Sequence, residues 1–273
     1  MLAAAPSKNG PNHLDSTIPQ ASVPVHILGG FLVLAEGKIG ESLQHENFIL
    51  DTGTSPSILN VRVARQLGLA LSPAKITAIG RDSEVASTTV PQLKLGALQT
   101  RSATFLVADL ADVERNWKVS IAGILGLDIL GQVSFRLDYE RQLLQFGAVS
   151  AKGIPIGLST GLNLPIAEVH INGRTLHLLV DTGSDHLVFF GGRNTTASDS
   201  SAAYAPGNSV AETVPVRQVP ALQFEWNGLR FQQTPLVVAG REEPLFDGLM
   251  SVRSMGFRSI AMDASSRVVY LQK

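Results

Sequence analysis

Two short segments of nearly the same sequence constrain the fold of this chain more than any other feature. Residues 48–50 and 178–180 are apolar triplets, and each runs directly into Asp-Thr-Gly and a hydroxyl residue, at Asp51 and at Asp181. Such a triplet is typical of a strand end that is covered on both faces. A carboxylate beside it is costly to bury without a partner. We therefore expect Asp51 and Asp181 to partner each other, although a single copy would indicate only an ordinary turn.

The similarity between the two copies extends beyond these segments. Further segments match in the same order: residues 35–36 with 167–168, 90–95 with 219–224, 105–108 with 235–238, and 123–144 with 248–269. A repeat of this length predicts two related lobes, at residues 21–150 and 151–273. Short alternating apolar runs separated by turn residues predict that both lobes are mainly β.

Composition excludes several classes of function. The formal net charge is −1 and no basic cluster stands out, so we expect no nucleic-acid partner. No apolar run approaches the roughly 18 residues of a transmembrane segment. The chain has no cysteine, which excludes disulfides, thiolate zinc sites and a cysteine nucleophile. Residues 1–20 have the composition of a flexible leader without the apolar core of a signal peptide, which leaves the compartment open.

The sequence predicts few helices. Residues 61–67 form a helical pattern that Asn60 can cap, and a shorter helix is expected at 127–130. In the second copy, residues 191–203 are polar and small, so we expect a loop where the first copy has its capped helix. Asn172-Gly173 predicts a tight hairpin turn between two strands.

Asp-Thr-Gly-Ser/Thr, followed about 70 residues later by two aliphatic residues and a glycine, resembles the aspartic peptidases of the pepsin and retropepsin superfamily. Here the later element is Ile124-Leu125-Gly126. The lobe length, the Asn-capped helix and the run at 123–130 look most like the retropepsin-like branch found in bacteria. Retropepsins usually carry one lobe per chain and pair as homodimers, whereas this chain carries both. The resemblance implies a mainly β fold of two pseudo-twofold-related β-barrel lobes with few short helices and an active-site cleft between the lobes.

The resemblance also implies an aspartic endopeptidase whose catalytic pair is Asp51 and Asp181. Two carboxyl groups a few ångströms apart share one proton and titrate as a unit. The ionised member can take a proton from a bound water, and the protonated member can donate to the peptide carbonyl. This chemistry needs no metal and no other cofactor. The partner would be a peptide or protein substrate, and the active unit a monomer, because both aspartates lie in one chain.

The neighbouring loop residues take supporting roles by the same resemblance. Thr52 and Thr182 would brace the two loops against each other through bonds from hydroxyl to backbone. The backbone amides of Gly53 and Gly183 would face the carboxylates.

By the same resemblance, Thr54 and Ser184 would hydrogen-bond to the outer carboxylate oxygens of Asp51 and Asp181. Beside the second loop, Asp185 occupies the position whose residue contacts substrate backbone in retropepsins. The first lobe has Ser55 at that position, so we expect an asymmetric cleft. His186, next along the chain, has two open interpretations: a specificity residue or a solvated turn histidine.

A hairpin of each lobe would close over the substrate as a flap. In the first lobe the predicted flap contains Gly80 and Arg81, and in the second it contains Gly207, with Tyr204 just before it. An exposed loop without a role is the alternative for both, because glycine-rich turns are common.

Two other classes of function stay open. A protease-like fold without turnover would serve as a binding module, although both aspartates and both following hydroxyls are intact. Phosphotransferases of the actin-like and sugar-kinase type also have two Asp-x-Gly-Thr/Ser loops, whose glycines admit phosphates. That fold needs longer helices than this sequence supplies. One departure from the repeat bears on the site: Ser251 stands where the first copy has Gly126, and we expect a local adjustment behind Asp181.

Overall fold

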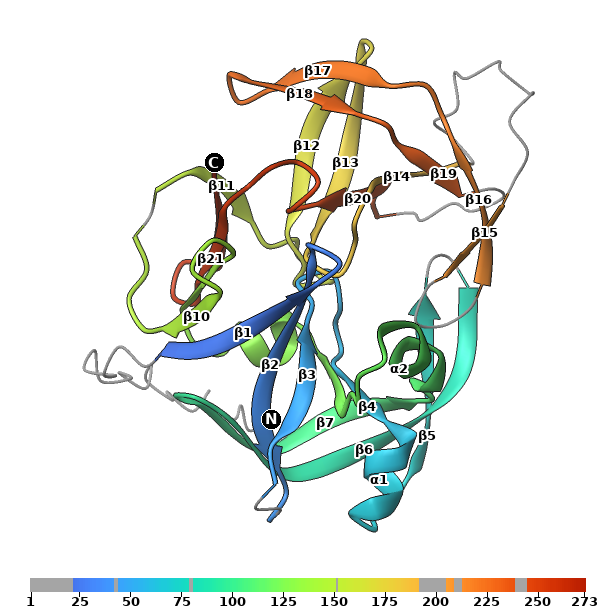
Figure 1. Cartoon of the computed structure of the whole chain (residues 1–273), viewed down its shortest axis with the longest axis vertical. Coiled ribbons are helices and arrows are strands. Elements are labelled where there is room, and N and C mark those ends of the chain that lie inside the picture. Colours follow the sequence, from blue (N-terminus) through green and yellow to red (C-terminus); the bar gives the residue numbers. More distant parts are fainter. Residues whose placement is uncertain are drawn as a thin grey trace, which may run out of the picture.

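The computed structural model describes residues 22–41, 44–78, 81–150, 152–191, 205–208, 213–238 and 245–273. At residues 75–78, 81–83, 205–208 and 213–214 only the backbone is described. The described residues form twenty-two strands and three short helices (Figure 1). The predicted mainly β fold class is therefore confirmed. None of the helices in these ranges is long and apolar enough to cross a membrane.

The first half of the chain, up to residue 150, contains ten strands and all three helices. They are β1 (Ser22–Leu28), β2 (Leu32–Ile39), β3 (Glu46–Leu50), β4 (Ile58–Asn60), α1 (Val61–Gln66), β5 (Ser72–Ala78), β6 (Arg81–Leu95), β7 (Leu98–Ala108), α2 (Ala111–Trp117), β8 (Gly123–Leu125), α3 (Leu127–Leu130), β9 (Phe135–Asp138) and β10 (Leu143–Phe146).

The second half of the chain, from residue 151, contains strands only in its described part. They are β11 (Ile154–Gly157), β12 (Ile166–Ile171), β13 (Arg174–Asp181), β14 (Leu187–Phe190), β15 (Ala205–Asn208), β16 (Thr213–Gln218), β17 (Leu222–Trp226), β18 (Leu229–Gln233), β19 (Leu236–Val238), β20 (Gly248–Ser251), β21 (Ser259–Asp263) and β22 (Val268–Gln272).

The strands around the two Asp-Thr-Gly segments are paired in the same way in both halves. In the first half β3 runs parallel to β8, and β4 lies antiparallel to β8 and parallel to β7. In the second half β13 runs parallel to β20, and β14 lies antiparallel to β20 and parallel to β19. Strands paired on both sides have no free edge and favour continuous apolar runs. The apolar triplets before the aspartates are those central strands.

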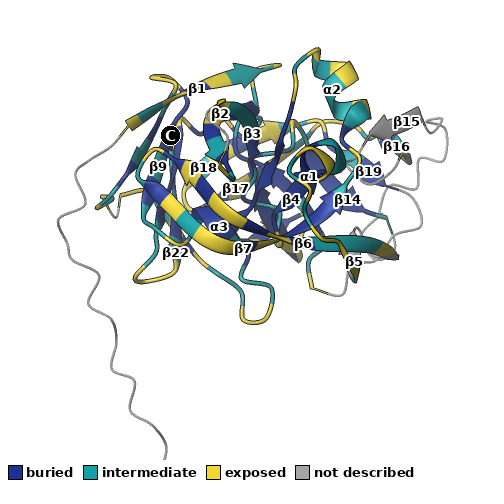
Figure 2. Ribbon diagram, turned by 90° about the horizontal axis from the view of Figure 1, so that it is seen from below, coloured by how far each residue is buried: buried dark blue, intermediate teal, exposed yellow. Residues whose placement is uncertain are grey.

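One sheet contains strands from both halves. Its order runs β11-β22-β21-β9-β10-β1, so β21 of the second half pairs antiparallel with β9 of the first. The two halves are therefore joined by a backbone ladder as well as by side chains. The largest buried cluster also spans both halves, and it includes Phe48 and Leu50 from one half and Leu178 and Val180 from the other. In Figure 2 β4 and β14 are coloured as buried, whereas parts of β6 and β7 are exposed.

Two of the three helices follow the prediction. In α1 the side chain of Asn60 accepts a hydrogen bond from Arg62 N–H as an N-cap, and Gly68 follows the helix with a positive φ of 61°. The short helix α3 lies at the predicted residues. The predicted turn is also present, since Asn172 and Gly173 both have positive φ between the paired strands β12 and β13.

The sequence did not indicate α2. Leu110 stands at its N-cap and makes no side-chain cap bond. The acid that accepts a hydrogen bond from Ala111 N–H is Asp109, which stands one position before the N-cap. Its sequence has only a weak apolar periodicity, and accordingly none of its residues is fully buried in the structure. The loop expected at residues 191–203 lies, apart from residue 191, outside the described residues.

Candidate active site

Two loops, one from each half of the chain, bring Asp51 and Asp181 together. Asp51 directly follows β3, and its N–H donates to Leu125 O at 2.9 Å, which continues the ladder with β8. Asp181 is the last residue of β13 and is paired with Ser251 on β20. A side-chain hydrogen bond joins the two carboxyl groups. Each aspartate thus has the other as its partner.

Gly53 and Gly183 each lie against the opposite carboxyl group. A Cβ added at Gly53 would lie 2.8 Å from Asp181 Cγ, and one added at Gly183 would lie 2.9 Å from Asp51 Cγ. Only glycine lets each loop approach the other aspartate so closely. Each glycine N–H also donates to the aspartate of its own loop, at 2.8 Å to Asp51 Oδ1 and 2.6 Å to Asp181 Oδ1.

The two threonines connect the loops through buried hydrogen bonds. Thr52 Oγ1 donates to Val180 O at 2.9 Å, and Thr182 Oγ1 donates to Leu50 O at 2.9 Å. Thr182 Oγ1 also accepts the N–H of Thr52 at 3.0 Å. These are bonds of the kind that the family resemblance implied for Thr52 and Thr182. They tie the end of each central strand to the loop of the other half.

The two hydroxyl residues after the glycines behave differently. Thr54 Oγ1 donates to the outer oxygen of Asp51, Oδ2, at 2.5 Å. Ser184 does not do the same for Asp181, which corrects the expectation from the resemblance. Its hydroxyl donates to His186 O at 3.1 Å and accepts His186 N–H at 3.4 Å, a local turn bond that competes for the serine. The hydrogen bond from Ser184 to Asp181 comes from the backbone.

Burial and charge favour a proton on Asp181. Only 8% of Asp181 is exposed, whereas Asp51 is half-buried. Burial holds the pKa of Asp181 well above its ordinary value, and the negative charge of Asp51 and the hydrogen bond to it act in the same direction. The amides of Gly183 and Ser184 oppose this rise in pKa. The geometry therefore supports a pair that shares one proton, held on the Asp181 side.

Ser251 fits behind Asp181 through its own hydrogen bonds. Its hydroxyl donates to Ser184 O at 2.6 Å and accepts Ser254 N–H at 3.1 Å. The side chain is fully buried, so both bonds are shielded from water. The local adjustment expected from the sequence takes this form.

The residues predicted to contact substrate are only partly described. Arg81 begins β6 and pairs with Ala78 of β5, while Gly80, which stands between them in the sequence, lies outside the described residues. Gly207 lies in β15 and pairs with Val214 of β16. Tyr204 also lies outside the described residues. In Figure 1, β5 and β15 both lie on the right side of the molecule.

Asp185 follows the second loop, and its side chain is 53% exposed. Its carboxylate is hydrogen-bonded to His186 Nδ1. The acid is thus accessible and held in place by its neighbour in the chain.

The sequence did not indicate a half-buried staple, a set of hydrogen bonds between Ser57 and Asp128 behind the first loop. Ser57 Oγ donates to Asp128 Oδ1 at 2.6 Å and accepts Gly126 N–H at 2.9 Å, and Ser57 N–H donates to Asp128 Oδ2 at 3.0 Å. The staple fixes α3 against the loop that carries Asp51. The sequence feature that could have indicated this contact is Asp128, the one acidic residue in the otherwise apolar run 127–130.

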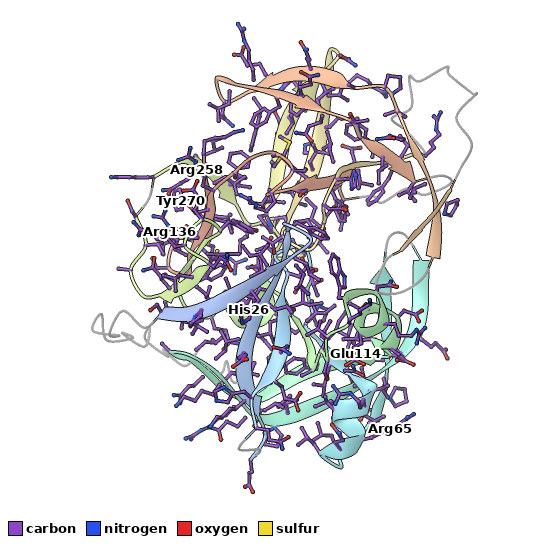
Figure 3. All side chains as sticks on the ribbon, viewed as in Figure 1. His26, Arg65, Glu114, Arg136, Arg258 and Tyr270 are labelled. Carbon is purple, nitrogen blue, oxygen red and sulfur yellow. The ribbon has the colours of Figure 1, made fainter. Side chains whose placement is uncertain are left out.

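A second missed contact joins the two halves near the aspartates. The guanidinium of Arg253 lies 5.0 Å from the ring centroid of Tyr139, and its Nε donates to Gly30 O at 3.3 Å. Burial raises the pKa of Tyr139; the charge of Arg253 opposes this, and those of Asp181 and Asp51 add to it. Tyr139 is therefore within electrostatic reach of the pair. Figure 3 labels Arg136 and Arg258, which lie in this joined region.

Comparison with known proteins gives one finding for this site. Residues 35–129 match a family model described as aspartyl protease. The matched span contains the Asp51 loop, the staple and all three helices except the last residue of α3. No curated protein matches the chain.

Proposed function

We propose that this chain is an aspartic endopeptidase that hydrolyses peptide bonds with a water activated between Asp51 and Asp181. The match of residues 35–129 to a family model described as aspartyl protease supports this proposal. The observation that carries the proposal is the contact between these two carboxyl groups, which come from separate halves and are hydrogen-bonded to each other. A pair of this kind provides one base and one acid at the same point.

The two aspartates divide the chemistry between them. Asp51, the more exposed member, acts as the base that takes a proton from the water. Asp181 holds the shared proton and donates it to the carbonyl oxygen of the scissile bond, in keeping with its raised pKa. The water oxygen forms a bond to the carbonyl carbon, which gives a neutral tetrahedral diol. Asp51 then passes its proton to the amide nitrogen, the C–N bond breaks to release the amine, and a hydroxyl proton of the diol returns to Asp181 as the carboxylic acid product forms. The fixed amides of Gly53 and Gly183 hold the carboxyl groups in orientation through this sequence.

The substrate would be an extended peptide that adds to the site as a strand. We propose that the hairpins containing Gly80, Arg81 and Gly207 close over it, with Tyr204 beside the second hairpin. Asp185 would accept a hydrogen bond from substrate backbone on one side of the scissile bond. Its exposure beside the second loop supports this role.

We further propose that the chain consists of two lobes, residues 21–150 and 151–273, and is active as a monomer. The matching pairing of β3, β4, β7 and β8 with β13, β14, β19 and β20 supports a tandem repeat. Since both aspartates lie in one chain, a second copy is not needed to complete the pair.

Cleavage of a peptide library, followed by mass spectrometry, tests the proposal. We expect cleavage that a statine-type transition-state mimic inhibits and that a metal chelator leaves unchanged. Asp51→Asn and Asp181→Asn should each reduce kcat by at least about 10²-fold while circular dichroism stays unchanged, because an amide cannot supply the missing proton step. Wild-type turnover by either variant would reject the assignment. Activity that is lost in chelator and restored by zinc would indicate another class of enzyme.

A further inference from the structure

Residues of opposite charge stand at matching positions behind the two Asp-Thr-Gly loops. Because residues 123–144 match residues 248–269, Arg253 occupies the position of Asp128. Asp128 forms the staple, which stays within the first half. The side chain of Arg253 instead leaves the second half and donates to Gly30 O of the first. The second half therefore uses this position for a contact between the halves.

The guanidinium of Arg253 makes three contacts at once. Its Nε donates to Gly30 O at 3.3 Å, and its Nη1 donates to Phe257 O at 3.1 Å. Its Cζ lies over the ring of Tyr139, 5.0 Å from the ring centroid. A planar guanidinium can donate along its edge while its face rests on an aromatic ring, which an ammonium group cannot do. We call the contacts with Gly30 and Tyr139, both in the first half, the Arg253 latch.

Tyr139 offers the latch the face of its ring. Only 4% of the residue is exposed, and its hydroxyl has no hydrogen-bond partner in the part of the chain that the structure describes. Its N–H donates to Arg258 O at 2.9 Å, which continues the ladder between β9 and β21. Packing and the backbone therefore hold the ring in place, and the hydroxyl does not.

The segment that carries Arg253 is bonded to the Asp181 loop. Ser251 pairs with Asp181, and its hydroxyl donates to Ser184 O at 2.6 Å. Val252 N–H donates to Asp181 O at 3.1 Å. Because Val252 adjoins Arg253 in the chain, a displacement of Arg253 acts on backbone that is bonded to Asp181.

On the other side of the latch, Gly30 belongs to the strands that carry Asp51. It lies in the turn between β1 and β2, and β2 pairs with β3, where Leu34 is opposite Ile49. Asp51 directly follows β3. In Figure 1 this turn lies at the middle of the molecule, where the latch joins the halves. The latch thus connects the strands before Asp51 with the loop of Asp181.

Electrostatics also place Tyr139 near the pair. Burial is the main cause that raises the pKa of Tyr139; the charge of Arg253 opposes this, and the charges of the two aspartates add to it. Charges act strongly on a group only over short distances. The ring of the latch is therefore close enough to sense both aspartates.

We propose that Arg253 is a positioning residue, and that its latch sets the separation of the Asp51 and Asp181 carboxyl groups. The proposal rests on the proposed function and adds to it a residue outside the two Asp-Thr-Gly segments. Two carboxyl groups share a proton strongly only while they stay in contact. A small change in how the two halves meet would therefore alter both the titration of the pair and its alignment with a substrate.

The kinetics of Arg253→Met test the proposal. Methionine keeps much of the length and the packing on the ring, but it removes the donors and the charge. We expect kcat to fall about 10- to 100-fold and KM to change by less than about twofold. The upper limb of the bell-shaped pH dependence should move down by about one pH unit, because carboxyl groups that lie further apart share the proton less strongly. Arg253→Lys, which keeps the charge without the planar fork, should narrow the bell as well.

Arg258→Met is the matched control. Arg258 also reaches across the halves, to Glu140 at 3.2 Å, but the two side chains are 64% and 59% exposed; Arg258 is labelled in Figure 3. An exposed ion pair contributes little, so this variant should keep kcat, KM and both limbs of the pH dependence. Tyr139→Leu, which removes the ring beside the guanidinium, repeats the test if Arg253→Met does not fold, and it should also narrow the bell.

Three results would overturn the proposal. The first is an unchanged bell width in both Arg253→Met and Tyr139→Leu, even if both variants melt earlier. The second is an equal shift of both limbs in Arg253→Met, which the loss of a nearby charge would cause. The third is a wild-type bell in Arg253→Lys, because charge alone would then suffice.

A direct titration separates this proposal from the proposed function. Carbon NMR of isotope-labelled aspartate carboxyl groups follows the pair without any turnover, and Asp51→Asn and Asp181→Asn assign its signals. Tyr139 stays neutral in the acidic range because its pKa is raised. If the two titration steps move closer together in Arg253→Met but the wild-type protein cleaves no peptide, the proposed turnover fails and the latch stands. If the protein cleaves peptides and the steps keep their separation in Arg253→Met, the latch alone fails.

Discussion

The two Asp-Thr-Gly loops are built on the same ladder of strands but are supported from behind in different ways. In the first half, Thr54 O accepts a hydrogen bond from Leu127 N–H at 3.2 Å, and a Cβ added at Gly126 would overlap that carbonyl oxygen. In the second half, Ser184 O accepts a hydrogen bond from the Ser251 hydroxyl at 2.6 Å. In the second half a side-chain hydroxyl thus donates to the loop carbonyl, whereas in the first half a backbone N–H does so.

A neighbouring glycine pair shows where the repeat allows no such exchange. Gly123 and Gly248 begin β8 and β20, and a Cβ at either would overlap a carbonyl oxygen of the facing strand, that of Ile58 or Val188. Both halves keep glycine at this point. In this repeat a glycine is therefore replaced where it faces a loop, and kept where it faces a strand of the sheet.

Exchanging the residues behind the loops should have the largest effect. Gly126→Ser places a side chain onto Thr54 O and should lower the free energy of unfolding by about 3 kcal/mol, the upper range for overpacking. Ser251→Gly loses the two hydrogen bonds of the buried hydroxyl and adds chain entropy to the unfolded state, at about 2 kcal/mol in total. Urea unfolding of both variants measures the difference. Equal losses would show that the two loops are supported alike.

Substrate binding should reveal the second asymmetry. Asp185→Ala would remove the proposed charge-assisted hydrogen bond to substrate backbone, and we expect kcat/KM to fall by about 10- to 100-fold, or ~1.5–3 kcal/mol. Ser55→Ala, at the matching position of the first half, should lower it much less. Kinetics with one good peptide substrate decide between them. A loss for Ser55→Ala as large as that for Asp185→Ala would reject the anchor.

The threonine braces also differ between the loops. The Thr182 hydroxyl takes part in two buried hydrogen bonds, and its loss would leave Thr52 N–H without its partner. Thr182→Val should therefore lower the free energy of unfolding by about 2 kcal/mol, and Thr52→Val, which loses one donated bond, by about 1 kcal/mol. Denaturant unfolding at one pH compares the two variants. The reverse order would mean that the braces do not act through these bonds.

The mainly β fold could be predicted from the sequence because alternating apolar runs and turn residues are local signals. The contact of the two aspartates could be predicted because the Asp-Thr-Gly segment is repeated, whereas a single copy would indicate only an ordinary turn. The staple from Ser57 to Asp128 and the contact of Arg253 with Tyr139 could not be predicted in this way. They depend on which distant residues the finished fold brings together.

Two further differences arise from competition between local groups. The Ser184 hydroxyl had two candidate partners, Asp181 and the backbone of His186, and residue type alone does not decide between them. The helix α2 has its capping acid one position early and a weakly apolar face, so sequence periodicity did not reveal it. Both cases concern the asymmetry of the two halves, which a repeat in the sequence tends to hide.

The smallest effect should appear as a pH dependence of stability that is specific to the second loop. Because the pKa of Asp181 is raised in the folded protein, the folded state binds its proton more tightly than the unfolded state. Stability is then fully present below the unfolded pKa of an aspartate, about 3.9, and falls as pH rises toward the folded pKa. Asp181→Asn imitates the protonated group and removes this loss. Its melting temperature relative to the wild-type protein should therefore increase as pH rises.

Asp263→Asn is the control, because the pKa of Asp263 is shifted in the opposite direction. Hydrogen bonds from the Ser265 and Ser266 side chains hold the pKa of Asp263 below its ordinary value. This carboxylate stabilises the folded state above the unfolded pKa, and the contribution is lost as pH falls through the folded pKa. The variant should melt slightly below the wild-type protein at neutral pH, and the gap should close on acidification. Thermal melts of the three proteins from pH 3 to 8 test both signs, and a gap for Asp181→Asn that stays constant across this range would mean that Asp181 is not the protonated member of the pair.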